Sequence, residues 1–164
     1  MIGRIQRSAD FERVLGQPSR ARSAHFAVHH LAAEPSEPRK PKSTAKPELS
    51  TGDAHNHAQA VDESPAPAPE PRPPAMPQQA WLGMVVPKRH ARRAVTRNLL
   101  KRQIRGLFQA EGRALPPGLW VVRLRAPFDR KQFVSARSEA LSAVVRAELR
   151  QLLERLQRGA SGRT

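Results

Sequence analysis

Hydrophobic and polar positions divide the chain into two patterned stretches, residues 1–32 and 80–164, with an unpatterned stretch between them. In the first stretch, apolar positions at helical spacing predict a helix over Ser8–Leu15, with Ser8 as its N-cap and Gly16 at its end. The loose alternation of Ser23–Leu31 then predicts a strand with His29 and His30 on opposite faces. This stretch therefore contributes one helix and one strand.

The second stretch predicts two strands, Trp81–Val86 and Leu119–Ala126, separated by a helix over Arg92–Glu111. A final helix is expected to begin at Lys131 or Ser135 and to end at Arg158. The element order is α-β-β-α-β-α. We therefore predict a small α/β fold, an α+β two-layer sandwich in which helices cover one face of a three- to four-stranded sheet.

Residues 33–79 lack the apolar side chains that a folded segment needs. They contain 11 of the 16 prolines, no aromatic residue, seven acidic and five basic residues. Such a segment cannot bury enough apolar surface to offset the entropy of ordering it, so we expect a disordered insert. Residues 1–164 are then one domain, interrupted by the insert 33–79.

The charge of the chain narrows the possible partners. The formal net charge is +15, and the insert carries −2, so the excess of positive charge belongs to the patterned stretches. This excess indicates a polyanionic partner. The longest apolar run, Trp81–Pro87, is too short to span a membrane, so no membrane association is expected. Met1–Arg7 has no apolar core after its arginines, and cysteine is absent; we expect a cytoplasmic protein without thiolate chemistry.

The positive charge is concentrated between Lys88 and Arg105, where eight basic residues occur without an acidic one. On a helix, Leu100, Ile104 and Phe108 share one face, and the face about 125° away is polar and basic. Arginine and lysine suit phosphate oxygens, and an asparagine amide such as Asn98 can also hydrogen-bond to a base or a ribose. This pattern predicts a nucleic-acid-binding helix but does not choose between RNA and DNA.

Two segments around the basic helix carry a long and position-specific pattern. They read Trp-Leu-Gly-Met-Val-Val-Pro-Lys-Arg over 81–89 and Arg-Arg-Ala-Val-Thr-Arg-Asn-Leu-Leu-Lys-Arg-Gln-Ile-Arg over 92–105. This pattern resembles that of the bacterial ribonuclease P protein family. The resemblance extends to Asp10–Leu15 and to Leu119–Arg125. It implies a left-handed crossover at the basic helix, and a protein subunit that assists the endoribonuclease ribonuclease P in removing the 5′ leader from precursor tRNA. The implied partners are the ribonuclease P RNA subunit and precursor tRNA, with no DNA. The RNA subunit is expected to carry the chemistry and the Mg²⁺, and the protein itself to bind no cofactor.

The resemblance also implies which residues contact RNA. The residues expected at the RNA subunit are Lys88, Arg89, Arg92, Arg93, Arg97, Asn98, Lys101, Arg102 and Arg105. A cleft between the first helix and the sheet is expected to hold the leader, lined by Phe11, Leu15 and His29. No catalytic or metal-ligating residue is expected. One position departs from the family pattern, since Leu99 stands where the motif has its second arginine.

Three alternatives remain at this point. The basic helix could anchor a noncatalytic RNA-binding module such as a ribosomal or assembly protein. A DNA-binding helix-turn-helix would need a second helix just before the basic one, where the buried strand is predicted instead. A histidine-based active or metal site could use His25, His29 and His30, but no carboxylate stands at a ligand spacing beside them.

Overall fold

The computed structural model describes residues 1–37, 76–133 and 139–161. Met1–Ser36 and Pro74–Thr164 form one unit, which contains every described helix and strand. The predicted insert lies outside the described residues except for its two ends, residues 33–37 and 76–79. The expectation that it is disordered therefore stays a prediction.

The unit is built on a mixed sheet of five strands in the order β1-β4-β5-β3-β2. The strands are β1 (Gly3–Arg4), β2 (Ser19–Arg22), β3 (Phe26–Leu31), β4 (Ala80–Val85) and β5 (Gly118–Leu124). β4 is parallel to both β1 and β5, and β3 is antiparallel to both β5 and β2. The predicted fold class is confirmed, but the sheet has five strands rather than three or four. The predicted strand over Ser23–Leu31 is the second half of a hairpin that begins at Ser19.

Three helices cover this sheet: α1 (Ser8–Leu15), α2 (Ala94–Glu111) and α3 (Glu139–Ser161), and a 3₁₀ turn, η1 (Gly112–Ala114), follows α2. α2 connects the parallel neighbours β4 and β5, so it forms the crossover whose left-handed sense the resemblance implies. Ser8 is the first residue of α1 and Arg7 is the N-cap, without a side-chain cap hydrogen bond. The prediction that Ser8 caps this helix is therefore wrong.

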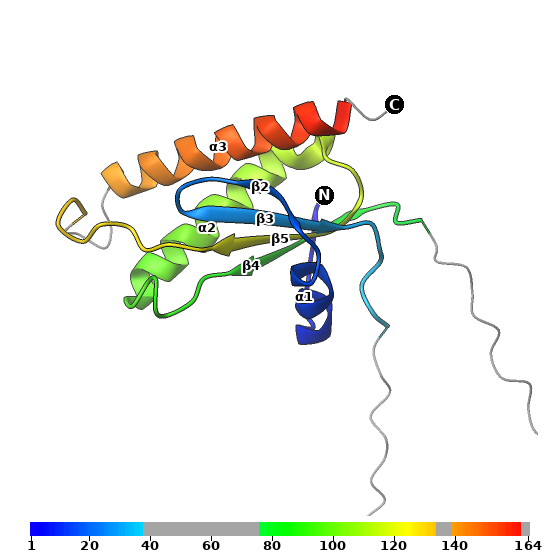
Figure 1. Cartoon of the computed structure of the whole chain (residues 1–164), viewed down its shortest axis with the longest axis horizontal. Coiled ribbons are helices and arrows are strands. Elements are labelled where there is room, and N and C mark those ends of the chain that lie inside the picture. The colour runs from blue at the N-terminus through cyan, green and yellow to red at the C-terminus, as the bar shows by residue number, and fades with distance from the viewer. Residues whose placement is uncertain (38–75, 134–138, 162–164) are drawn as a thin grey trace, which may run out of the picture. The chain divides into compact units, whose positions relative to one another are not determined.

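The main core lies between the sheet and the pair α2 and α3, which run along the same face (Figure 1). Phe26, Val28 and Leu124 from the sheet are fully buried there against Leu100 and Leu149 from the helices. The helices bring apolar stripes to this face because their buried residues recur every three or four positions. This layer holds α2 in place and leaves its opposite side exposed.

The other face of the sheet is covered by α1, contrary to the prediction that all helices share one face. Ile5, Val14, Leu119 and Val121 form a second buried cluster on this side. β5 is thus buried on both faces, which explains why Leu119–Val122 is a continuous apolar run rather than an alternating one. Alternation along β3 still places His29 on the α1 side and His30 against Trp120 on the α2–α3 side.

Candidate nucleic-acid interface

The outer side of α2 is exposed and basic. Asn98, Lys101, Arg102 and Arg105 are all exposed, whereas Leu100, Ile104 and Phe108 on the inner side are buried. The burial of one helix face therefore forces the four polar side chains outward. Arg105 also borders a hollow of about 230 Å³ beside β1, which it shares with Arg4. The structure confirms the geometry expected of this helix; the RNA contacts themselves stay a prediction.

The segment between β4 and α2 presents further basic residues. Hydrogen bonds from the backbone N–H groups of His90 and Ala91 to the carbonyl oxygen of Pro87, both 3.1 Å, fold it into a turn. Ala91 is buried at the base of this turn. The four basic residues around it, Lys88, Arg89, Arg92 and Arg93, are exposed. The predicted helix begins at Arg92, but α2 begins at Ala94. Arg92 and Arg93 therefore precede the helix and do not lie on it.

Arg97 is less exposed than the other basic residues of α2, because it turns back toward this segment. Its Nη1 atom donates hydrogen bonds to the carbonyl oxygens of Ala91, at 2.9 Å, and Arg92, at 2.8 Å. A guanidinium in such a position orders the backbone that carries Arg92 and Arg93. Arg97 therefore positions neighbouring basic residues, a property that the sequence pattern did not indicate.

Leu99 is only 7% exposed and belongs to the main core. The chain thus uses the position of the family's second motif arginine for packing. The buried face of α2 is therefore wider than the predicted stripe, which did not include Leu99.

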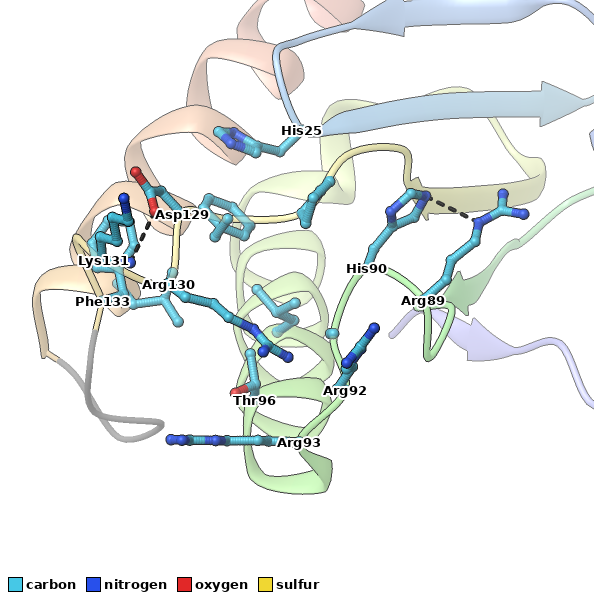
Figure 2. A pocket seen from close by; sticks show the side chains of 15 residues that line it. His25, Arg89, His90, Arg92, Arg93, Thr96, Asp129, Arg130, Lys131 and Phe133 are labelled. Atoms are coloured by element: carbon cyan, nitrogen blue, oxygen red, sulfur yellow. Dashed lines mark hydrogen bonds between the residues drawn. The ribbon is translucent and has the colours of Figure 1, made fainter.

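Most basic residues of this surface form no ion pair with a carboxylate that the structure describes. Among the described residues, no ion pair involves Lys88, Arg89, Arg92, Arg97, Lys101, Arg102 or Arg105. Unpaired cations on one surface create a positive potential that attracts a polyanion. Arg89, Arg92 and Arg93 also line a hollow of about 770 Å³ at the N-terminal end of α2 (Figure 2).

Phe11, Leu15 and His29 lie together on the α1 side of the sheet. Phe11 and Leu15 are half-buried against the second cluster, and a Cβ atom at Gly83 would lie 2.5 Å from Cε1 of Phe11. The missing side chain at Gly83 thus lets the Phe11 ring rest on β4. His29 is 9% exposed, and its Nδ1 atom donates to the carbonyl oxygen of Gln17 at 2.9 Å. Neither of the two hollows named above is lined by these three residues, so their assignment to a leader cleft stays a prediction.

The histidines of β3 and its preceding turn are each engaged with a different partner. His25 is linked to Glu148 of α3, with Nδ1 and Oε2 2.8 Å apart, although these residues are far apart in the sequence. The ring of His30 stacks on Trp120, and its Nε2 atom is 3.1 Å from the carbonyl oxygen of Pro117. Within the described parts of the chain, no three His, Asp or Glu side chains are grouped as metal ligands would be.

Asp10 lies in α1 and is an acidic residue, yet it is only 1% exposed. Its carboxylate accepts hydrogen bonds from the backbone N–H and the hydroxyl of Ser36 and from Arg13. Burial alone would raise the pKa of Asp10, but these hydrogen bonds hold the pKa below the ordinary value of 3.8. Asp10 therefore fastens the beginning of the predicted insert to α1.

The fold and the exposed basic helix place this chain in a class of small α+β proteins that present a basic helix face to solvent. None of its described helices is both long enough and apolar enough to cross a bilayer. The family model described as Ribonuclease P matches residues 3–157. The chain therefore belongs to the ribonuclease P protein family, as the resemblance of residues 81–105 predicted.

Individual relatives agree with this assignment. The chain is 42% identical over 81 residues to the "Ribonuclease P protein component" of Burkholderia pseudomallei and 47% identical over 73 residues to that of Bordetella parapertussis. These matches cover 49% and 44% of this chain, and 60% and 55% of the relatives' own length. The solved structure of the Staphylococcus aureus RNase P protein has a similar fold, with a TM-score of 0.51, 16% identity and 94% coverage of both chains.

Proposed function

We propose that this chain is the protein subunit of ribonuclease P and that it acts in the cytoplasm. In this proposal it binds the catalytic RNA subunit and the 5′ leader of precursor tRNA and so assists the endonucleolytic removal of the leader. The RNA subunit, with its Mg²⁺, carries the hydrolysis of the phosphodiester bond. The polypeptide contributes binding, and no residue of the chain is assigned a catalytic function.

The observation that carries this proposal is the exposed, unpaired basic side of α2 in a chain that belongs to this family. Asn98, Lys101, Arg102 and Arg105 point away from the core and meet no described carboxylate. Each phosphate neutralised on such a surface releases condensed counterions, which favours binding at moderate salt. Phe11 on the other side of the sheet offers an aromatic ring to an unstacked leader base.

Reconstitution with a bacterial ribonuclease P RNA tests the proposal. The purified full chain is added to that RNA and a precursor tRNA with a labelled leader at low magnesium, and cleavage is followed over time. We expect faster cleavage with the chain than without it, and a loss of this enhancement in the triple variant Lys101→Ala, Arg102→Ala, Arg105→Ala. Arg113→Ala, which removes an exposed charge beyond the other end of α2, is the matched control.

RNA binding without any enhancement of cleavage would instead indicate a noncatalytic RNA-binding module. Comparing the affinity of the holoenzyme for precursor tRNA with its affinity for mature tRNA then isolates the contribution of the leader to binding. The holoenzyme is expected to bind the precursor more tightly, and Phe11→Ala is expected to reduce that difference without abolishing binding to the RNA subunit.

A further inference from the structure

The hollow at the N-terminal end of α2 is bounded by segments that are distant in the sequence. The turn before α2 and the first residues of α2 form one side, and residues 127–133 after β5 form the other (Figure 2). Leu141 of α3 contributes to the lining, and the volume is about 770 Å³. This volume is in the range of sites that hold small organic ligands. We call it the α2 cleft.

The inner part of the α2 cleft is apolar and contains two aromatic rings. Leu100 and Leu141 in its lining are buried core residues, and Phe128 and Phe133 pack on the same core. The ring of Phe133 meets that of Phe128 edge-on, with centroids 6.2 Å apart. An apolar surface of this kind suits a flat ring more than a strongly hydrated anion.

Phe128 is held in place by a chain of contacts that ends at α3. Its ring stacks on His25 with a centroid distance of 3.9 Å and an interplanar angle of 12°. The carboxylate of Glu148 hydrogen-bonds to both the backbone N–H of His25, at 2.7 Å, and the ring Nδ1, at 2.8 Å. The Phe128 ring is therefore held in place without a ligand. Little conformational entropy of this ring is then lost when a ligand binds.

The rim of the α2 cleft carries five basic residues: Arg89, Arg92, Arg93, Arg130 and Lys131. Asp129 is the one carboxylate among the lining residues that the structure describes. It accepts a hydrogen bond from the backbone N–H of Lys131 at 2.8 Å and so closes the turn there. Figure 2 shows basic side chains from both segments around the same hollow. One carboxylate among five cations leaves the rim positive, which favours an anionic ligand.

We infer that the α2 cleft binds one unstacked nucleotide of single-stranded RNA, with its base against Phe133 and its phosphates between the basic residues of the two segments. An apolar aromatic floor with a cationic rim matches a nucleotide, which joins a flat base to charged phosphates. A duplex hides its base faces by stacking, so the ligand is single-stranded. The site is distinct from the exposed residues of α2 at positions 98, 101, 102 and 105, none of which lines the cleft. This inference rests on the proposed function, because the RNA that the cleft is inferred to bind is that of ribonuclease P.

Fluorine NMR of the full chain labelled with fluorophenylalanine tests this inference. The chain has five phenylalanines, so Phe128 and Phe133 in the cleft are read separately from Phe11 on the α1 side; Phe→Leu variants assign the signals. The probes are a single-stranded adenosine pentamer and an abasic RNA of the same length, in which all five bases are removed and the ribose-phosphate backbone is kept. We expect the pentamer to shift the Phe128 and Phe133 signals and the abasic RNA to shift them much less.

Variants complete the test. Arg130→Ala with Lys131→Ala should weaken the pentamer affinity read at Phe133 about tenfold, because two cations that pair with phosphate are removed, and Arg113→Ala should leave it unchanged. Phe133→Leu, which keeps most of the apolar volume, should weaken the pentamer affinity comparably by removing the stacking face, and in this variant the affinity is read at Phe128. Equal shifts with the abasic RNA, shifts at Phe11 alone, or equal binding of a hexaglutamate peptide would each overturn the inference.

The cleavage assay keeps this inference separable from the proposed function. If the chain enhances leader cleavage while the cleft signals stay silent, only the nucleotide site is wrong. If the cleft signals shift with the pentamer and cleavage is not enhanced, the single-strand site stands and the ribonuclease P proposal fails.

Discussion

The guanidinium of Arg97 lies 2.9 Å from the carbonyl oxygen of Ala91 and donates a hydrogen bond to it through Nη1. The same atom also bonds to the carbonyl oxygen of Arg92. A basic residue of the motif thus uses hydrogen-bonding capacity on the backbone of the preceding turn. Arg97 contributes to the positive surface and also fixes the positions of its neighbours.

This double contribution distinguishes Arg97 from Arg102. Arg97→Ala should lower the free energy of unfolding by about 1–2 kcal/mol, because it removes two hydrogen bonds from a charged donor. It should also weaken RNA binding, since Arg92 and Arg93 are no longer held. Urea unfolding and a binding titration measure the two effects. If Arg97→Ala leaves the stability at the wild-type value, the hydrogen bonds to the turn do not order it.

Arg102→Ala should weaken binding to a ribonuclease P RNA while leaving stability unchanged, because the side chain is exposed and makes no described hydrogen bond or ion pair. Removing one cation that pairs with a phosphate lowers the slope of log affinity against log salt by about 0.7–0.9. The titration is repeated at several salt concentrations with Arg113→Ala as the control of equal charge. A slope identical to that of wild type would remove Arg102 from the phosphate-binding residues.

Much of this surface was predictable from the sequence because α2 is strongly amphipathic, so its exposed side follows from the spacing of Leu100, Ile104 and Phe108. The two short edge strands were not predictable. β2 reads Ser-Arg-Ala-Arg and β1 has two residues, so neither carries an apolar alternation, and both form by pairing with a neighbour. The predicted apolar stripe also left out Leu99, which is 7% exposed and belongs to the main core.

Only some of the residues of the α2 cleft could be predicted from the sequence, because the cleft joins two segments that are far apart in the chain. Arg89, Arg92 and Arg93 stand within the basic run, but Arg130 and Lys131 belong to a separate segment after β5. The parallel pairing of β4 with β5 brings the residues that follow each strand to the same end of the sheet. His25 and Glu148 show the same limit, because only the packing of α3 brings them together.

Acidification should destabilise the protein through His30. Burial lowers the pKa of His30 below its ordinary value of 6.5, against the opposing effect of the hydrogen bond to Pro117. Well above pH 6.5 the histidine is neutral in both the folded and the unfolded state, so its contribution to the free energy of unfolding does not change with pH. Below that pH the unfolded state takes up the proton first, so stability falls by at most about 1.4 kcal/mol per pH unit. Urea unfolding between pH 7.5 and 5.5 measures this slope. His30→Gln should reduce it, and His90→Gln, in the turn before α2, should not.

Asp10→Asn should lower stability at neutral pH by about 1–3 kcal/mol, because the buried carboxylate accepts hydrogen bonds from Ser36 and Arg13. The pKa of Asp10 is lowered in the folded state, so its contribution is complete above about pH 4 and is lost as the pH falls through the folded pKa. The difference between wild type and Asp10→Asn should therefore shrink in acid. Glu12→Gln, an exposed change on the same helix, is the control; a constant difference down to pH 2 would contradict the assigned pKa.

Replacing residues 38–75 with a Gly-Ser linker should leave leader cleavage and RNA affinity within about twofold of wild type, because a change in loop length alters the closure entropy only logarithmically. The effect on stability depends on where the replaced segment begins and ends. Ser36 is fastened to Asp10, and the carbonyl oxygen of Gln79 accepts a hydrogen bond from the backbone N–H of Gly118 at 2.9 Å. Replacing the whole predicted insert, residues 33–79, removes the Ser36 hydrogen bonds to Asp10 and should lower the Tm by roughly 4–8 °C. Thermal unfolding and the cleavage assay are run on both variants. Loss of cleavage in the shorter replacement at an unchanged Tm would show that residues 38–75 contribute to function directly.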